Sequence, residues 1–171
     1  MLLHQRVGLD QRLEAVFRMA QVRQGIVAWR ATGAALLVPF WCTVLAEVSA
    51  HLGHTEDGFQ ALVEAHTLVE QHEERWWEAE VYRLRGVLLL RKDVAQQEEA
   101  EAWLQRALDV ARRQQAKSLE LRAAMSLARL WQRQGKHTAA YELLAPVYNW
   151  FTEGFDTADL QEARALLEAL G

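Results

Sequence analysis

Four segments of this chain repeat one short apolar pattern at a nearly constant interval, about 40 residues. The large apolar position of the pattern holds Val22, Leu62, Leu104 and Leu144, three residues later stand Gly25, Ala65, Ala107 and Val147, and four residues earlier stand Arg18, Gly58, Ala100 and Ala140. Residues with these spacings share one face of a helix. Small residues on that face let a neighbouring helix approach closely, and the large side chain fills the groove between the two.

A second register lies between these segments. Leu45-Ala46 recurs two intervals later as Leu127-Ala128, with Arg85-Gly86 midway, and the same double interval separates the turn glycines Gly53 and Gly135. Each unit is therefore expected to be a helix, a tight turn and a second helix. A period of this length is typical of solenoids, in which such units stack.

The predicted fold is all-α, a right-handed superhelix of antiparallel helix pairs within a single domain over residues 1–171. We expect helices at 10–31, 35–52, 56–72, 75–92, 96–114, 117–134, 138–152 and 157–170. They form a half unit at 10–33, whose first helix is missing, units at 34–73, 74–115 and 116–153, and a capping helix within 154–171. Pro146 should distort the helix 138–152 and steer Trp150 and Phe151 back onto the preceding pair before Gly154 turns the chain.

Composition agrees with a folded helical protein. Hydrophobic residues make up 51% of the chain, charged residues 25%, and there are two prolines. The net charge of -4 argues against nucleic acid as the main partner. The single cysteine, Cys42, excludes an intramolecular disulfide, and with no signal peptide after Met1 it favours the cytoplasm. The apolar run 31–48 contains Gly33 and Pro39, so it predicts a buried helix rather than a membrane span.

No catalytic or metal-binding pattern emerges from the polar residues. Glu47, His51 and His54 lie near the end of one predicted helix and its turn, but no H-E-x-x-H motif or nearby cysteine accompanies them. We therefore expect no metal and no cofactor. Cys42 stands in an apolar run and is interpreted as a small buried residue. The carboxylates at 73–74 and 98–101 resemble solvated helix starts. The chain is therefore predicted not to be an enzyme.

The repeats resemble the tetratricopeptide (TPR) pattern, with its residues at the usual relative spacing in Leu127, Ala128, Trp131, Gly135, Ala140, Leu144 and Val147. The units depart from it in being about 40 residues long and in lacking the closing proline. Segments 22–33, 74–86 and 143–157 are similar to the C-terminal repeats of bacterial multidomain signalling ATPases linked to adenylate-cyclase or transcription-regulator domains. The resemblance implies a regulatory scaffold or sensor region. The chain itself has no phosphate-binding G-x-x-x-x-G-K-[ST] loop.

The resemblance to TPR repeats predicts a partner-binding groove lined by the first helices of the pairs. The projected positions are Phe40, Thr43, Glu47, Glu80, Arg83, Val87, Arg122, Met125 and Arg129. If Arg83, Arg122 and Arg129 turn their guanidinium groups to solvent, a carboxylate-bearing ligand is expected. Seven tryptophans should mostly pack between repeats, but adjacent Trp76 and Trp77 cannot both face one core, so one of them should be partly exposed.

Three functions remain open from the sequence. The first is a protein-interaction scaffold for a protein or peptide, including another domain of the same parent chain. The second is self-association, giving a homodimer through the exposed end of the solenoid at residues 1–35. The third, an all-helical enzyme, finds no support in the residues. No nucleic-acid or membrane partner is expected.

Overall fold

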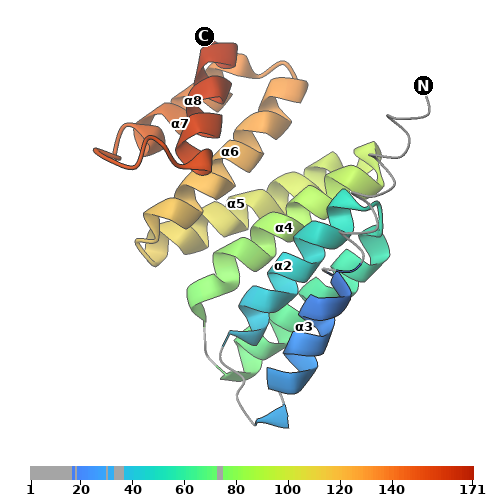
Figure 1. Cartoon of the computed structure of the whole chain (residues 1–171). Helices are drawn as coiled ribbons and strands as arrows, with labels where there is room; N and C mark the ends of the chain where they lie inside the picture. Colours follow the sequence, from blue (N-terminus) through green and yellow to red (C-terminus); the bar gives the residue numbers. More distant parts are fainter. Residues whose placement is uncertain (1–16, 18, 30, 33–36, 73–74) are drawn as a thin grey trace, which may run out of the picture. The chain divides into compact units, whose positions relative to one another are not determined.

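The computed structural model describes residues 17, 19–29, 31–32, 37–72 and 75–171 (Figure 1). They belong to two compact units, the first ending at Trp77 and the second beginning at Glu78. Across these ranges the regular structure is helical and no strand occurs, which confirms the all-α prediction. The single domain stays a prediction, and the two units are described separately below.

Unit 1 contains helical residues 19–29, α2 (Val38–His51), α3 (Thr55–His72) and the short 3-10 helix η1 (Arg75–Trp77). Pro39 lies in the first turn of α2, where its missing N–H costs no helical hydrogen bond. At the other end, Gly53 has φ +80° and the amide of His54 donates to the Ser49 carbonyl at 2.9 Å. This left-handed turn ends α2 and folds α3 back along it.

Unit 2 contains α4 (Glu78–Lys92), the 3-10 helix η2 (Val94–Gln96), α5 (Gln97–Arg113), α6 (Lys117–Arg133), α7 (His137–Tyr148) and α8 (Ala158–Leu170). From α4 to α8, each α-helix packs on the next, α4 also packs on α6, and α6 also packs on α8. The turn after α6 repeats the one after α2, because Gly135 has φ +75° and the Lys136 amide donates to the Trp131 carbonyl at 2.9 Å.

The predicted repeat positions are buried in the later segments, whereas in the first segment Val22 is half-buried and Gly25 is exposed. The small and large positions of the last two segments are all buried, and so are Leu62 and Ala65 of the segment before them. Gly86 shows why the small residues are needed: a Cβ there would lie 2.8 Å from Leu104 Cγ and 2.9 Å from the Ala100 carbonyl oxygen. Only a residue without a side chain lets α4 approach α5 this closely.

Several boundaries differ from the sequence prediction. The helix expected at 75–92 begins with the 3-10 turn η1, and the helix expected at 138–152 ends at Tyr148, two residues after Pro146. Phe151 packs against the core of unit 2 as predicted, whereas Trp150 meets the preceding helices only at their surface: it is 57% exposed, and its ring centroid lies 5.5 Å from the Lys117 ammonium. Arg18 and most of the first half of the helix predicted at 10–31 lie outside the described residues.

Candidate binding surface

A row of aromatic side chains links α2 to η1 within unit 1. Trp41, Phe40, Trp77 and Trp76 follow one another with ring centroids 5.1, 5.2 and 5.0 Å apart. The Trp77 indole N–H donates to Thr43 Oγ1 at 2.8 Å, and the Thr43 hydroxyl donates to the Phe40 carbonyl at 2.7 Å. These bonds fix Trp77 on α2. Trp76 remains 40% exposed, which confirms that one member of the pair faces solvent.

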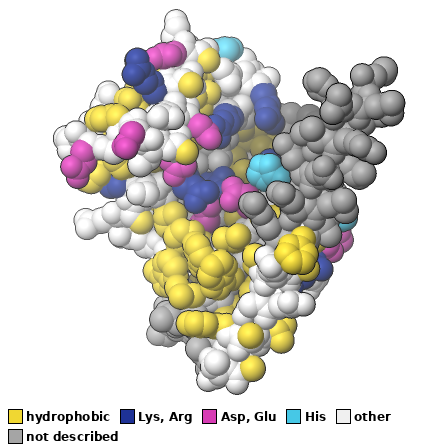
Figure 2. Space-filling model, in the orientation of Figure 1, with side chains coloured by type: hydrophobic (Ala, Val, Ile, Leu, Met, Phe, Trp, Pro, Cys, Tyr) yellow, Lys and Arg dark blue, Asp and Glu magenta, His cyan; other side chains and the backbone are white. Residues whose placement is uncertain are grey.

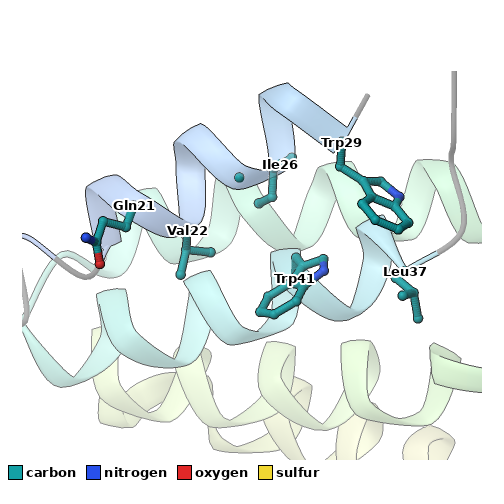
Figure 3. A pocket seen from close by; sticks show the side chains of 7 residues that line it. Gln21, Val22, Ile26, Trp29, Leu37 and Trp41 are labelled. Carbon is teal, nitrogen blue, oxygen red and sulfur yellow. The ribbon is translucent and has the colours of Figure 1, made fainter. Parts of the chain in front are cut away.

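An apolar cavity of about 540 Å³ opens beside this row, also within unit 1 (Figure 3). Its described lining consists of Gln21, Val22, Gly25, Ile26 and Trp29 from helical residues 19–29, together with Leu37 and Trp41. In Figure 3 the side chains of Val22 and Ile26 point toward α2, which carries Trp41. Trp29 and Trp41 are 40% and 39% exposed, so both indoles present large apolar areas to solvent.

Trp41 belongs to both features and joins them. We call the set Trp29, Trp41, Phe40, Trp77 and Trp76 the aromatic surface of unit 1. Its described cavity lining carries no charged side chain and one polar side chain, that of Gln21. A concave, mostly apolar site with exposed indoles suits an apolar ligand or the apolar side chains of another protein. Cys42 follows Trp41 on α2 and is fully buried as predicted, so its thiol is not accessible as a nucleophile.

The arginines predicted to form an acidic-ligand groove are held in ion pairs. Arg83 is 8% exposed and donates two hydrogen bonds to Glu80 at 2.8 and 2.7 Å. Arg122 lies 3.0 Å from the same carboxylate, and Arg129 lies 2.7 Å from Glu162 on α8. Figure 2 likewise shows basic and acidic side chains interspersed. The prediction that all three guanidinium groups face solvent is wrong, because α4 and α8 supply carboxylates at these positions.

Three other projected groove positions, Thr43, Met125 and Glu80, are buried. Thr43 and Met125 are buried, so the prediction that they contact a partner is wrong. Glu80 is buried beneath the two arginines, and Val87 packs against the core of unit 2. Phe40 and Glu47 are half-buried, and Phe40 is part of the aromatic surface. Phe40, Thr43 and Glu47 belong to unit 1, and the other six positions belong to unit 2.

The projection from sequence missed Trp29, Leu37 and Trp41. It considered only the first helices of pairs, whereas the cavity needs a second helix as well. A signal was available, because Val22 and Gly25 carry the repeat pattern of a second helix although the predicted half unit lacks a first helix to cover them.

A polar cluster closes the turn between α5 and α6 in unit 2. Glu120 accepts hydrogen bonds from Arg112 at 3.0 Å and from Lys117 at 2.7 Å. Burial alone would raise the pKa of Glu120, but the hydrogen bonds and charges of Lys117 and Arg112 outweigh it and lower the pKa below its ordinary 4.5. The Lys117 ammonium also lies 5.5 Å from the Trp150 ring centroid. These charges satisfy one another, so the cluster is best explained as a structural one.

Among the described residues, no three His, Cys, Asp or Glu side chains gather in a way that would hold a metal ion. Nor does any helix in the described ranges combine the length and apolar character required to cross a membrane. Comparison of the chain with family models, curated proteins and solved structures found no match. The site must therefore be interpreted from its own geometry.

Proposed function

We propose that this chain is a non-catalytic interaction module, a TPR-like superhelix that binds a protein or peptide through the aromatic surface of unit 1. The right-handed stack of helix pairs and the capping role of α8 belong to this proposal. The contacts of α4 with α5 and α6, and of α6 with α7 and α8, support it. In a solenoid each helix pair contacts only its neighbours in the stack.

The observation that carries the proposal is the cavity lined by Trp29 and Trp41. Each indole leaves about two fifths of its surface in water, next to an opening of about 540 Å³. Tryptophan is enriched at the centres of protein interfaces, because one side chain supplies a large contact area with few rotatable bonds. The accompanying scarcity of polar groups favours binding without bond-making chemistry.

The resemblance to the C-terminal repeats of signalling ATPases supplies the context of the proposal. In that context the module acts in the cytoplasm as a scaffold or sensor in a larger signalling chain. Its partner is then either another domain of that chain or a separate protein. Neither source changes the chemistry expected at the aromatic surface.

Affinity capture with matched variants tests the proposal. The wild-type chain should recover a partner from an extract of its source organism, and Trp41→Ser should weaken that binding by about tenfold or more. Trp150→Ser removes an exposed indole from unit 2 and serves as the control. Recovery of the same proteins in equal amount by all three chains would refute the proposed role of the surface.

Self-association is the second candidate function, and the exposure of Gly25 beside the half-buried Val22 favours it. These positions belong to the repeat pattern that is buried in the later segments, so a second copy could cover them. Sedimentation equilibrium distinguishes the two functions: a dimer that Trp41→Ser dissociates favours self-association, and a wild-type monomer excludes it.

A further inference from the structure

The cavity of unit 1 corresponds in sequence to a covered face of unit 2. The offset of two repeat intervals that relates Gly53 to Gly135 also relates Val22 to Leu104, Gly25 to Ala107 and Trp41 to Ala123. In unit 2, the three corresponding residues are buried in one apolar core. In unit 1, Val22 is half-buried, and Gly25 and Trp41 are exposed.

The element that covers this face in unit 2 is α4. It packs on α5, which carries Leu104 and Ala107, and on α6, which carries Ala123. Gly86 marks the closest approach, where any side chain would collide with Leu104. In unit 1 the open cavity is bounded in the same way by a second helix, residues 19–29, and by the first helix of the next pair, α2.

We infer that the cavity of unit 1 is the docking site of one α-helix from a partner protein, apolar on one face and carrying glycine or alanine at its closest approach. This inference rests on the proposed function and specifies the chemistry of the partner. In unit 2 the equivalent face is covered by α4, a helix of the same chain that packs on α5 and α6.

The two tryptophans explain the requirement for small residues. Under the same offset Trp29 corresponds to Ala111, and Trp41 to Ala123, so indoles stand where unit 2 has buried methyl groups. A helix that enters the cavity passes between these two indoles. It can come close only if its inward positions are small, and the indoles then contact its backbone and flanking apolar side chains.

Four helices of a second copy, α3, α4, α6 and α7, are poor occupants. The large exposed hydrophobic side chains on α3 and α7 are Val63 and Tyr141, one on each helix. The apolar faces of α4 and α6 are already buried within unit 2. A partner helix with an uncovered apolar face therefore fits the site better than α3, α4, α6 or α7 of another molecule of this protein.

A peptide with the sequence of residues 78–92, which forms α4, provides the probe. Fluorescence anisotropy of the labelled peptide with the full chain should show saturable binding. A second peptide carrying Gly86→Leu should bind at least about tenfold more weakly, since its side chain blocks the close approach. Equal binding of the two peptides, or no saturable binding of the first, would overturn the inference.

Two protein variants locate the binding. Gly25→Leu should weaken peptide binding at least about tenfold without unfolding the chain, because a Cβ at Gly25 meets no atom within 4 Å. Ala20→Leu adds the same side chain at an exposed position on the opposite side of that helix and should bind as the wild type does. Unchanged binding by Gly25→Leu overturns the inference, as does a wild-type dimer that this substitution dissociates. The capture experiment with Trp41→Ser can succeed even if both peptides fail, which separates this inference from the proposed function.

Discussion

Helical residues 19–29 of unit 1 and α5 of unit 2 carry one apolar pattern in two different environments. Leu104 and Ala107 on α5 are fully buried beneath α4, whereas Val22 is half-buried and Gly25 is exposed. The pattern therefore marks a face built for close helix packing, whether or not another part of the described chain covers it. An uncovered face of this kind is where a binding site should be sought.

The two units also differ in how far their ion pairs are exposed to solvent. In unit 1, Arg23 and Asp57 form an ion pair at 3.0 Å with both side chains nearly half exposed. In unit 2, Glu80 lies beneath Arg83 and Arg122 with its carboxylate almost fully buried. Solvent screens the first pair, while the second must remain complete because each buried charge depends on its partners.

Removing the buried carboxylate should have the largest effect. Glu80→Gln leaves two guanidinium groups without their shared counter-charge and should lower the free energy of unfolding by about 3 kcal/mol. Asp57→Asn, which breaks the exposed pair of unit 1, should cost less than about 1 kcal/mol. Urea unfolding of both variants measures the difference, and equal losses would contradict the contrast between the units.

Truncating Leu104 should cause the next largest loss of stability. Leu104→Ala opens a cavity between α4 and α5 and should cost about 3 kcal/mol. The corresponding change Val22→Ala should cost about 1 kcal/mol or less, because water already reaches that side chain. If thermal unfolding showed comparable destabilisation in the two variants, the face bearing Val22 would have to be covered in solution.

Larger side chains at the small positions should cause an intermediate loss of stability in the packed segments. Ala107→Leu and Ala65→Leu should each destabilise by about 2 kcal/mol, since both residues are fully buried. Gly25→Leu should instead leave stability unchanged or raise it by up to about 1 kcal/mol, because leucine is the better helix former and the space is open. Unchanged melting temperatures for Ala65→Leu and Ala107→Leu would show that the repeat register is wrong.

The smallest effect concerns pH. Because the folded-state pKa of Glu120 lies below its ordinary 4.5, its stabilisation is present above that value and is lost as the pH falls through the lowered pKa. Glu120→Gln should thus cost less than about 1 kcal/mol at neutral pH, given its partly exposed partners, and nothing in strong acid. Chemical denaturation across the acid range tests this, and a pH-independent cost would contradict it.

The placement of the aromatic surface shows where prediction from sequence succeeded. Adjacent tryptophans cannot share a core, so spacing alone predicted that one of the pair would be exposed, and the structure shows that it is Trp76. Spacing did not predict the cavity beside Trp41, because its two walls come from helices whose contact depends on tertiary packing. The arginine groove failed for a related reason: the projection from TPR repeats identified Arg83 and Arg122 without the carboxylate of Glu80 that packing brings against both.

The sequence by itself determined the helices, the turn glycines and the small positions, because these depend on local propensity and on which residues share a helix face. Gly53 and Gly135 are left-handed, as their spacing predicted. Only the tertiary structure decided which charges are neutralised and which apolar face stays open. Both outcomes depend on side chains from helices distant in sequence, and a periodic pattern specifies the face that packs but not what packs against it.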